Sequence, residues 1–519
     1  MDNSRRVAYP IREQTISELI KSRAEKFKEK LLFEYVGQRV TYAEFAEKTA
    51  IIAGNLNKLG IKKGDRVCLM MNNSMIIQEC FYGIWRRGAA AVSLSTMFTE
   101  REVVYVINNS HAKMVICFEE FVPIIMSAKK QTPSIEKVIV TSEKKIPGTL
   151  PYKVLFEPVE IFEEEIEPDD LALISYTSGT TGKPKGAMLT NINLLIDAKA
   201  GSEAARYTSD DVQLIMLPLF HLFAITVNAL FGYYAGASMP IISRFDLKDV
   251  FEAIDKFKVS NLVGVPTMYI YMYNYPEANK YDTASLRIGL IGGGSVSPDL
   301  KESFEKKFNM RLLEVYGQTE TSPMVCMESP TGERRRGSMG QKISFWEVRI
   351  VDENDQDVPI GQAGELVVRG PGVMRGYFEM PEETEEAFRN GWHHTGDIAR
   401  MDNDGFLYFV DRSKDMLITG GYNIYPKEIE DIIYTHPAIL EVAVVGVPDE
   451  IKGDLAKAFI VKKQGQEVTA EEIMSLCREN LAAYKCPRLI EFIDALPKTP
   501  QGKITKISLR EKERSAKRK

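Results

Sequence analysis

The chain has 519 residues, enough for two or more domains, and its 44% hydrophobic and 27% charged residues are typical of a soluble globular protein. A net charge of −6 argues against nucleic acid as the main partner. The six cysteines are scattered, without CxxC pairs or histidines at metal-ligand spacing, which favours reduced thiols in a cytoplasmic protein over a disulfide framework or a zinc site.

Residues 11–170 alternate helical and strand patterns. Thr41 and Glu44 have the spacing of a capping box and predict a helix that stops at Gly60. A strand pattern over 66–71 and a helical pattern over 74–85 follow, and short apolar runs recur over 261–265 and 286–291. This repetition predicts α/β layers with parallel sheets.

A glycine-rich segment follows a predicted buried strand over 171–176. Residues 176–186 read Tyr-Thr-Ser-Gly-Thr-Thr-Gly-Lys-Pro-Lys-Gly. Backbone N–H groups freed by such a turn, with hydroxyls and lysines beside them, suit phosphate, and nucleotide sites often lie at strand ends. The segment is not a Walker P-loop, because only two residues separate Gly179 from Gly182 and Pro184 replaces the magnesium-binding hydroxyl. A flexible surface turn is the alternative.

One stretch tests the expectation of a soluble protein. Residues 214–242 contain no charged side chain and are long enough to span a bilayer. Proline, glycine, histidine and asparagine residues interrupt the stretch, so we favour strand, turn, buried helix (225–234), turn and strand within a large core. The N-terminus lacks the apolar core of a secretion signal.

The character of the sequence changes near Gly340. Short antiparallel strand patterns over 348–351 and 364–370 predict a small β-rich lobe over 341–411. Strand patterns over 441–447 and 456–461 and a helical pattern over 470–483 predict a compact α+β unit after it.

Between them, the charged junction over 411–415 is a candidate hinge. The basic end of the chain over 510–519 is interpreted as a solvated tail rather than a nucleic-acid arm.

Four further motifs make a coherent set only together. They are Tyr-Gly-Gln-Thr-Glu (316–320), His-Thr-Gly-Asp (394–397), the pair Asp411 and Arg412, and Pro-Gln-Gly-Lys-Ile (500–504). Taken singly, each has a plainer explanation as an exposed turn carboxylate, a surface ion pair or a solvated lysine.

In this order and spacing the motifs resemble those of the acyl-adenylate-forming (AMP-binding) superfamily, which includes acyl-CoA synthetases, aryl-CoA ligases, luciferases and peptide-synthetase adenylation domains. The resemblance extends over residues 15–508. It implies an α/β fold with a large N-terminal domain of two α/β subdomains and a β-rich lobe, followed by a small mobile α+β C-terminal domain. We therefore expect an N-terminal AMP-binding domain over 1–411 and a C-terminal domain over 412–519.

The resemblance implies that ATP and coenzyme A are co-substrates and that Mg²⁺ is the cofactor. A carboxylic acid would attack the α-phosphate of ATP to give acyl-AMP and pyrophosphate, and a thiol would then displace AMP. Such chemistry depends on positioning and on charge screening. Thr177 and Glu320 would lie near Mg²⁺, and Lys503 would bridge the carboxylate and the α-phosphate. The residues that would wrap the phosphates are Thr177, Ser178, Gly179, Thr180, Thr181, Gly182 and Lys183.

The resemblance also implies which residues would bind the nucleoside part of ATP. Asp397, helped by Arg412, would hold the ribose hydroxyls, and Tyr316 would stack on adenine. The remaining nucleotide-binding positions are Gly293, Gly294, Ser295, Gly317, Gln318 and Thr319. Here the segment Ile-Gly-Gly-Gly-Ser (291–295) stands where Ser-Gly-Gly-Ala-Pro is common, which puts the adenine contacts in doubt.

For the second half-reaction the C-terminal domain would swing about Lys414. Gly420, Gly421 and Tyr422 would then face the adenylate, since a side chain at Gly421 would block the pantetheine arm. A turn before the helix that starts at Pro426 is the alternative explanation of the two glycines.

On the acyl side, His221 would contact the substrate, unless it is a satisfied core histidine. Val265, Gly292 and Gly317 would border the acid or the thiol, with further wall from residues 222–228. Because these positions are apolar or small, we favour an apolar monocarboxylic acid, with a medium- or long-chain fatty acid ahead of an aryl acid.

Three functions remain open from the sequence. The first is an acid–CoA ligase, and the second is a stand-alone enzyme that loads a carrier protein. The third is an inactive nucleotide-binding or membrane-associated interaction protein, against which Glu320, Asp397, Arg412 and Lys503 argue. We expect small-molecule partners and no transmembrane segment, and leave a homodimer and a peripheral membrane contact open.

Overall fold

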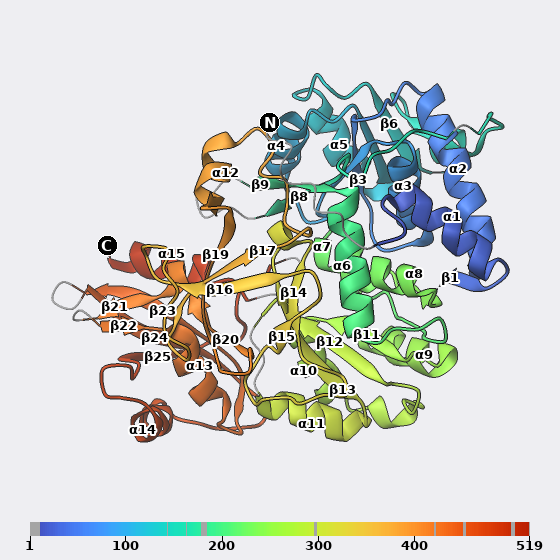
Figure 1. Ribbon diagram of the computed structural model, residues 1–519. Helices are drawn as coiled ribbons and strands as arrows, with labels where there is room; N and C mark the ends of the chain where they lie inside the picture. The colour runs from blue at the N-terminus through green and yellow to red at the C-terminus, as the bar shows by residue number, and fades with distance from the viewer. Residues whose placement is uncertain are drawn as a thin grey trace.

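The computed structural model describes residues 11–142, 144–161, 163–177, 184–294, 298–419, 422–449, 453–499 and 504–517, without the side chains of 414, 418, 422, 423, 453 and 514–517. Figure 1 shows the N-terminal elements in blue and teal, a second group in green and yellow, and the C-terminal elements in orange and red. The α/β architecture predicted from the sequence is confirmed.

The first layer is a seven-stranded sheet in the order β7-β6-β5-β3-β4-β8-β9. All neighbouring pairs are parallel except β8 and β9, which are antiparallel. Its strands are β3 (Arg66–Met70), β4 (Ala90–Ser93), β5 (Met114–Phe118), β6 (Lys137–Thr141), β7 (Leu150–Pro151), β8 (Leu171–Thr177) and β9 (Lys185–Thr190). The accompanying helices are α1 (Ile16–Phe27), α2 (Tyr42–Lys58), α3 (Met75–Arg86), α4 (Glu100–Ser110) and α5 (Val122–Lys129).

Helix α2 begins as the sequence predicts. The Thr41 side chain accepts a hydrogen bond from the N–H of Glu44, whose carboxylate accepts one from the N–H of Thr41. A three-stranded sheet packs beside this layer, formed by β10 (Met239–Pro240), β1 (Leu31–Tyr35) and β2 (Gln38–Thr41) in that order.

The second layer is a five-stranded sheet in the order β11-β12-β13-β14-β15. Its first three strands are parallel and the last two antiparallel. The strands are β11 (Asn261–Gly264), β12 (Ile288–Gly292), β13 (Arg311–Gly317), β14 (Met324–Met327) and β15 (Gln341–Lys342). The helices of this part are α6 (Asn191–Ala204), α9 (Leu247–Phe257), α10 (Pro266–Asn274) and α11 (Pro298–Phe308).

The long uncharged stretch belongs to the core. Its predicted helix is composite: α7 (Leu222–Ile225) and α8 (Phe231–Ala235) flank a π-helical turn over Thr226–Leu230, and nearly all of these residues are buried. Within the described ranges, no helix combines the length and apolar composition that a bilayer crossing requires. The six cysteines are buried free thiols.

The lobe predicted over 341–411 contains a sheet in the order β16-β17-β19-β18, with β20 on β19. Its elements are β16 (Glu347–Val351), β17 (Gly364–Arg369), α12 (Pro381–Ala387), β18 (Phe388–Arg389), β19 (Trp392–Met401) and β20 (Leu407–Arg412). Residues 375–378 run along β9, with the N–H of Met188 donating to the oxygen of Gly376 (2.9 Å) and the N–H of Phe378 to that of Gly186 (2.8 Å). The lobe is therefore tied to the first sheet beside the glycine-rich segment.

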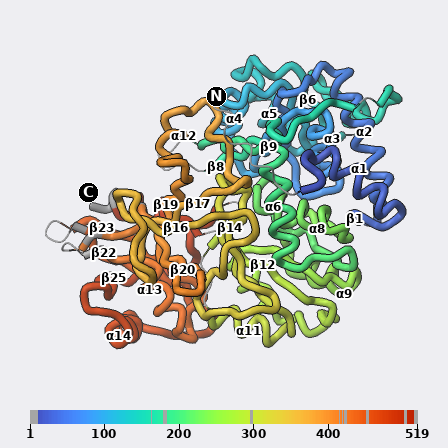
Figure 2. Tube along the Cα trace, in the orientation of Figure 1, coloured from blue at the N-terminus to red at the C-terminus, as the bar shows by residue number. Residues whose placement is uncertain are grey.

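The residues after Arg412 form their own sheet, β22-β21-β24-β23 with β25 on β24, and gather at one side of the molecule (Figure 2). Its elements are β21 (Leu417–Thr419), β22 (Tyr422–Ile424), α13 (Pro426–Tyr434), β23 (Ile439–Asp449), β24 (Gly453–Lys462), α14 (Ala470–Asn480), β25 (Leu489–Phe492) and α15 (Ile507–Lys517). Helix α14 ends three residues before the predicted Ala483, because Leu481 is already extended (ψ 151°).

Candidate functional site

A cavity of about 1490 Å³ lies where the two layers, the lobe and the C-terminal elements meet. Strand ends supply much of its wall, as in other α/β proteins that bind ligands beyond the carboxyl ends of parallel strands. The predicted site residues that line it are Thr177, His221, Gly293, Gly294, Tyr316, Gly317, Gln318, Thr319, Glu320, Asp397 and Arg412. Positions that are far apart in the sequence are thus brought to one cavity.

The described flanks of the predicted phosphate-binding segment, Thr177 and Pro184, line this cavity. Thr177 is the last residue of β8, and its hydroxyl donates to the backbone oxygen of Lys185 on β9 at 3.5 Å. The hydroxyl of Tyr105 donates to the oxygen of Pro184 at 2.9 Å. Both flanks of the segment are therefore fixed by neighbouring elements.

Several predicted positions lie outside the described residues. They are Ser178, Gly179, Thr180, Thr181, Gly182, Lys183, Ser295, Gly420, Gly421 and Lys503.

The turn after β13 admits no side chain at Gly317. A Cβ atom there would lie 1.5 Å from the oxygen of Pro323, because the chain folds back on itself at this point. The turn continues through Gln318 into a short 3₁₀ helix (η6, Thr319–Thr321). It thereby holds Tyr316 on one side and Glu320 on the other at a fixed separation.

Asp397 is the acceptor of a compact hydrogen-bonded group. Its Oδ2 atom accepts from the hydroxyl of Tyr316 at 2.7 Å and from Nε2 of Gln318 at 2.8 Å. The Arg412 Nε lies 3.6 Å from its Oδ1, and the side chain of Asp397 is only 6% exposed. Burial and the Asp397 carboxylate raise the pKa of Tyr316, which keeps its hydroxyl protonated as a donor.

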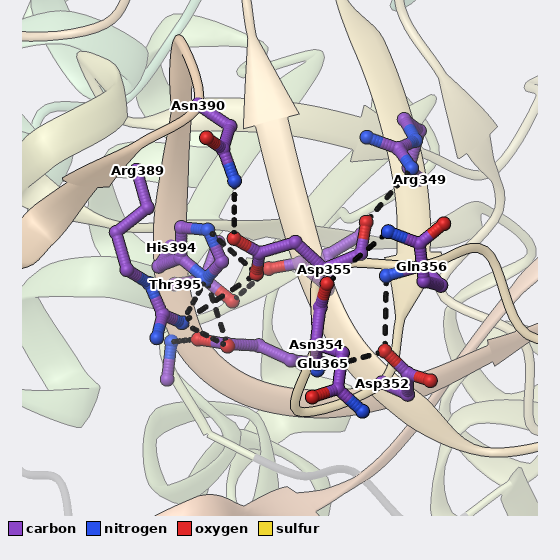
Figure 3. Close-up of polar contacts among 12 residues, drawn as sticks. Arg349, Asp352, Asn354, Asp355, Gln356, Glu365, Arg389, Asn390, His394 and Thr395 are labelled. Atoms are coloured by element: carbon purple, nitrogen blue, oxygen red, sulfur yellow. Dashed lines mark hydrogen bonds and ion pairs between the residues drawn. The ribbon is translucent and has the colours of Figure 1, made fainter.

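Asp397 lies in β19 at a β-bulge opposite β17. Figure 3 shows His394 and Thr395 of this bulge beside Glu365. Gly396 has a positive φ of 68°, and its N–H donates to Oε1 of Glu365 at 3.0 Å. The hydroxyl of Thr395 donates to the oxygen of Leu366 at 2.6 Å and accepts from the N–H of Asp397 at 3.1 Å. The carboxylate of Asp397 is therefore aimed by backbone contacts with β17.

A charged network beside this bulge includes His394, whose side chain is 6% exposed. Its Nδ1 lies 2.9 Å from Oε2 of Glu365, and its Nε2 lies 3.5 Å from Oδ1 of Asp355. Arg389 and Asn390 complete the network around the two carboxylates, as Figure 3 shows. The sequence motif contained His394, but nothing in it indicated Glu365 or Asp355 as partners.

Glu320 has a partner that sequence reasoning missed. The hydroxyl of Tyr377 donates to Oε1 of Glu320 at 2.8 Å, and burial together with Glu320 raises the pKa of Tyr377. The ammonium of Lys185 lies 5.1 Å from the centre of the Tyr377 ring. Since Tyr377 lies in the segment that runs along β9, only the fold brings it to Glu320.

The carboxylate of Glu314 was also missed. It lines the cavity from β13, and burial raises its pKa to about 7, although Lys301 and Lys427 act in the opposite direction. A single acidic residue in an apolar strand gives no sequence signal of this kind.

His221 caps α7 on the acyl side of the cavity. Its Nδ1 accepts from the N–H of Phe223 at 3.2 Å, so a neutral ring carries its proton on Nε2. Phe220 and Phe223 line the cavity beside it.

The other predicted acyl-side positions, Val265 and Gly292, are buried just behind the wall, where a Cβ at Gly292 would lie 2.6 Å from Val315 Cγ2 and 3.3 Å from Phe223 Cζ. Of residues 222–228, only Phe223 lines the cavity.

The C-terminal elements close the cavity with residues 504–507 and Arg510. Lys506 lies 2.7 Å from Glu430, and Arg510 lies 2.6 Å from Asp415. Lys414 falls in a short 3₁₀ helix (η7, Ser413–Asp415) that directly follows β20. The backbone of Tyr422 lies in β22, and no described residue from 416 to 426 lines the cavity. Strands β21 and β22 lie at the left edge of the C-terminal elements in Figure 1.

Two family models match this chain. The model described as AMP-binding enzyme matches residues 20–378, and the model described as AMP-binding enzyme C-terminal domain matches residues 428–503. The chain belongs to the AMP-binding enzyme family. The resemblance inferred from the motifs, including that to the family's acyl-CoA synthetase branch, is confirmed.

The similar proteins include CoA ligases that are named after fatty acids and others that are named after aryl acids. A long-chain-fatty-acid–CoA ligase of Escherichia coli O6:H1 is 34% identical over 538 residues, covering 97% of this chain and 96% of the relative. A feruloyl-CoA synthase of an Amycolatopsis species is 34% identical over 479 residues, covering 91% and 94%. A crystal structure of an anthranilate CoA ligase in complex with anthranoyl-AMP matches with a TM-score of 0.92 at 27% identity, covering 100% of both chains.

Proposed function

We propose that this member of the AMP-binding family is an ATP-dependent carboxylic acid–CoA ligase. One observation carries the proposal: a single cavity gathers Thr177 and Glu320, the Asp397 acceptor group and the turn flanks at 504–507. The CoA-ligase names of the similar proteins support the same reaction class. We further propose that it acts in the cytoplasm on small molecules rather than on nucleic acid.

Asp397 and its partners would hold the nucleoside. Because Tyr316 and Gln318 both donate to Oδ2, Oδ1 would take the ribose hydroxyls with Arg412 beside it. Tyr316 would stack on the base, next to Gly293 and Gly294. The phosphates would then extend toward Thr177 and the segment that follows it.

The oxygen donors of Glu320 and Thr177 fit Mg²⁺, which takes most of its ligands from water and substrate phosphates. No group of three or more His, Cys, Asp or Glu side chains among the described residues could form a full protein cage. When bound, the ion would screen phosphate charge. Tyr377 would keep Glu320 in position by its 2.8 Å hydrogen bond.

The first half-reaction would join the acid to AMP. A carboxylate oxygen attacks the α-phosphorus, the bond to the pyrophosphate oxygen breaks, and acyl-AMP and pyrophosphate result. Lys503 would bridge the two anions with its ammonium, from a turn whose flanks line the cavity.

The second half-reaction would transfer the acyl group to CoA. We propose that the parts over 1–411 and 412–519 are separate domains and that the latter turns about Lys414, with the hinge at 411–415. Gly420, Gly421 and Tyr422 would then reach the adenylate. The CoA sulfur attacks the acyl carbon, the carbon–oxygen bond to AMP breaks, and AMP leaves.

The acid is proposed to be an apolar monocarboxylic acid, with a long- or medium-chain fatty acid favoured. Phe220, Phe223, Ile270 and Met324 give the cavity that contains His221 apolar lining. An aryl acid is the second candidate, since the feruloyl and anthranilate enzymes are similar to this chain over most of its length.

An assay of CoA-dependent AMP release with a panel of fatty and aryl acids tests the proposal. We expect release with at least one apolar acid and none without CoA. Acyl-AMP formation without any CoA-dependent release would favour the carrier-protein alternative. ATP binding without turnover on any acid would favour an inactive nucleotide-binding protein.

A further inference from the structure

A short β-bridge joins the two described segments that flank residues 500–503 in the sequence. Lys498 and Ile504 pair as antiparallel bridge partners, and the N–H of Thr505 donates to the oxygen of Pro497 at 2.9 Å. Thr499 and Ile504, one on each of these segments, line the cavity. The position of this bridge therefore sets where both segments meet the cavity.

The Lys498 side chain connects this bridge to both sides of the cavity. Its ammonium lies 2.7 Å from Oε1 of Glu441 on β23 and donates to the hydroxyl of Tyr271 at 3.0 Å. Tyr271 lies on α10, within the N-terminal part, far along the chain from the junction over 411–415. The three side chains thus form a continuous path from the C-terminal sheet to α10.

The two contacts of Lys498 differ in character. The Glu441 side chain is 4% exposed, so its carboxylate needs the nearby cation permanently. Burial alone would lower the pKa of Lys498, but the hydrogen bonds with Glu441 and Tyr271 raise it overall, which keeps the ammonium charged. Tyr271 is 40% exposed, so its hydroxyl is hydrated whenever Lys498 moves away. The contact with Glu441 is therefore structural, whereas the contact with Tyr271 can be made and broken.

Helix α10 also contributes to the acyl side of the site. Its residues Pro266, Thr267 and Ile270 line the cavity, and Tyr271 follows directly. A contact at Tyr271 consequently sets the Lys498–Ile504 bridge relative to a helix that lines the cavity.

We propose that Tyr271 and Lys498 are positioning residues for acyl-adenylate formation, acting together to seat the Lys498–Ile504 bridge against α10. The proposal rests on the proposed two-step ligase reaction. In the second step the C-terminal part turns away, so the Tyr271 contact is absent and its loss has no effect on that step.

The variant Tyr271→Phe tests this, because it removes the hydroxyl and keeps the ring. Losing one hydrogen bond to a charged donor should slow ATP–pyrophosphate exchange about three- to tenfold. The maximal rate of exchange should decrease, while the KM for ATP should stay unchanged. Thioester formation from supplied acyl-AMP and CoA should stay within about twofold of the wild type, since the contact plays no part in that step.

The matched control is Tyr275→Phe, at the end of the same helix, whose hydroxyl donates to Glu277 and not to the C-terminal part. It should leave both half-reactions unchanged. In a double-mutant cycle, adding Tyr271→Phe to Lys498→Met should cost no more than Lys498→Met alone.

Equal losses in both half-reactions, an unchanged exchange rate in Tyr271→Phe, or fully additive losses in the cycle would overturn the inference. These outcomes are distinct from failure of the proposed function, in which the wild-type protein itself shows no exchange and no thioester formation.

Discussion

The two sides of the cavity are built differently. The nucleotide wall, defined as residues 316–320 and 394–397, is held by hydrogen bonds among its own members and by the lobe behind it. The C-terminal wall, defined as residues 498–499 and 504–507, reaches the opposite side through contacts such as that of Lys498 with Tyr271. The comparison indicates a preformed binding surface facing an adjustable one.

Such a division suits a reaction with two steps. The nucleoside stays bound through both half-reactions, so its contacts gain from being rigid. The groups that assist each step are needed in turn, so they gain from lying on a part that can move. Damage to the two walls should therefore have different kinetic consequences.

The largest effect is expected from Lys503→Ala, the position that precedes Ile504 of the C-terminal wall in the sequence. Removing the ammonium that we propose stabilises the transition state of acyl-AMP formation should slow pyrophosphate exchange about a hundred- to a thousandfold. Thioester formation from supplied acyl-AMP should be largely retained, as single-turnover measurements with CoA would reveal. Comparable loss of both steps would contradict the proposed movement of the C-terminal part.

The variant Asp397→Ala probes the nucleotide wall. It removes the proposed ribose acceptor and leaves the Tyr316 hydroxyl and the Gln318 amide without their shared partner. We expect the KM for ATP to rise about ten- to a hundredfold, in both the exchange and the overall assay. Glu353→Gln, a change at an exposed carboxylate of the same lobe, is the control. A selective loss of one half-reaction would erase the distinction between the walls.

A smaller effect is expected from Tyr377→Phe. This change removes the hydrogen bond to Glu320 while the carboxylate itself remains. Adenylation should slow about three- to tenfold, and the Mg²⁺ concentration for half-maximal activity should rise, because Glu320 is less well oriented. Tyr408→Phe, whose hydroxyl contacts Asp402 within the lobe, should change neither quantity. An unaltered Mg²⁺ dependence in Tyr377→Phe would exclude a role for Tyr377 through Glu320.

The smallest effect concerns pH and Glu314. Since burial raises the pKa of Glu314 from 4.5 to about 7, the folded protein keeps a proton that the unfolded chain loses at lower pH. Its contribution to stability is therefore favourable below pH 4.5, declines between pH 4.5 and 7, and stays low above pH 7. The Glu314→Gln variant does not lose this stability as the pH rises. The Tm of the variant minus the Tm of the wild type should therefore be about 2 °C larger at pH 8 than at pH 5. A Tm difference independent of pH would show that Glu314 is not buried as described.

Local features were predictable from the sequence because local contacts decide them. The capping box at Thr41 fixed the start of α2, and the apolar run before Thr177 indicated a strand that ends at the site. The motif containing Asp397 could be linked to nucleotide binding only through resemblance, since its spacing alone has ordinary explanations.

Long-range contacts were not predictable. Glu365 reaches Gly396 across two paired strands, and Tyr377 reaches Glu320 because its segment runs along β9. The π-helical turn inside the predicted helix over 225–234 depends on packing within the core, which overrides local helix preference. The sequence carries no periodic signal for such contacts.

The pairing of residues 375–378 with β9 has a consequence for how this protein can diverge. Main-chain hydrogen bonds at Gly186 and Met188 place Tyr377, and these bonds do not depend on which side chains surround them. Surface side chains of the lobe can therefore be substituted without moving Tyr377 away from Glu320. Insertion or deletion of a single residue in either paired segment is a different matter, because it would shift the register and separate the two groups at once.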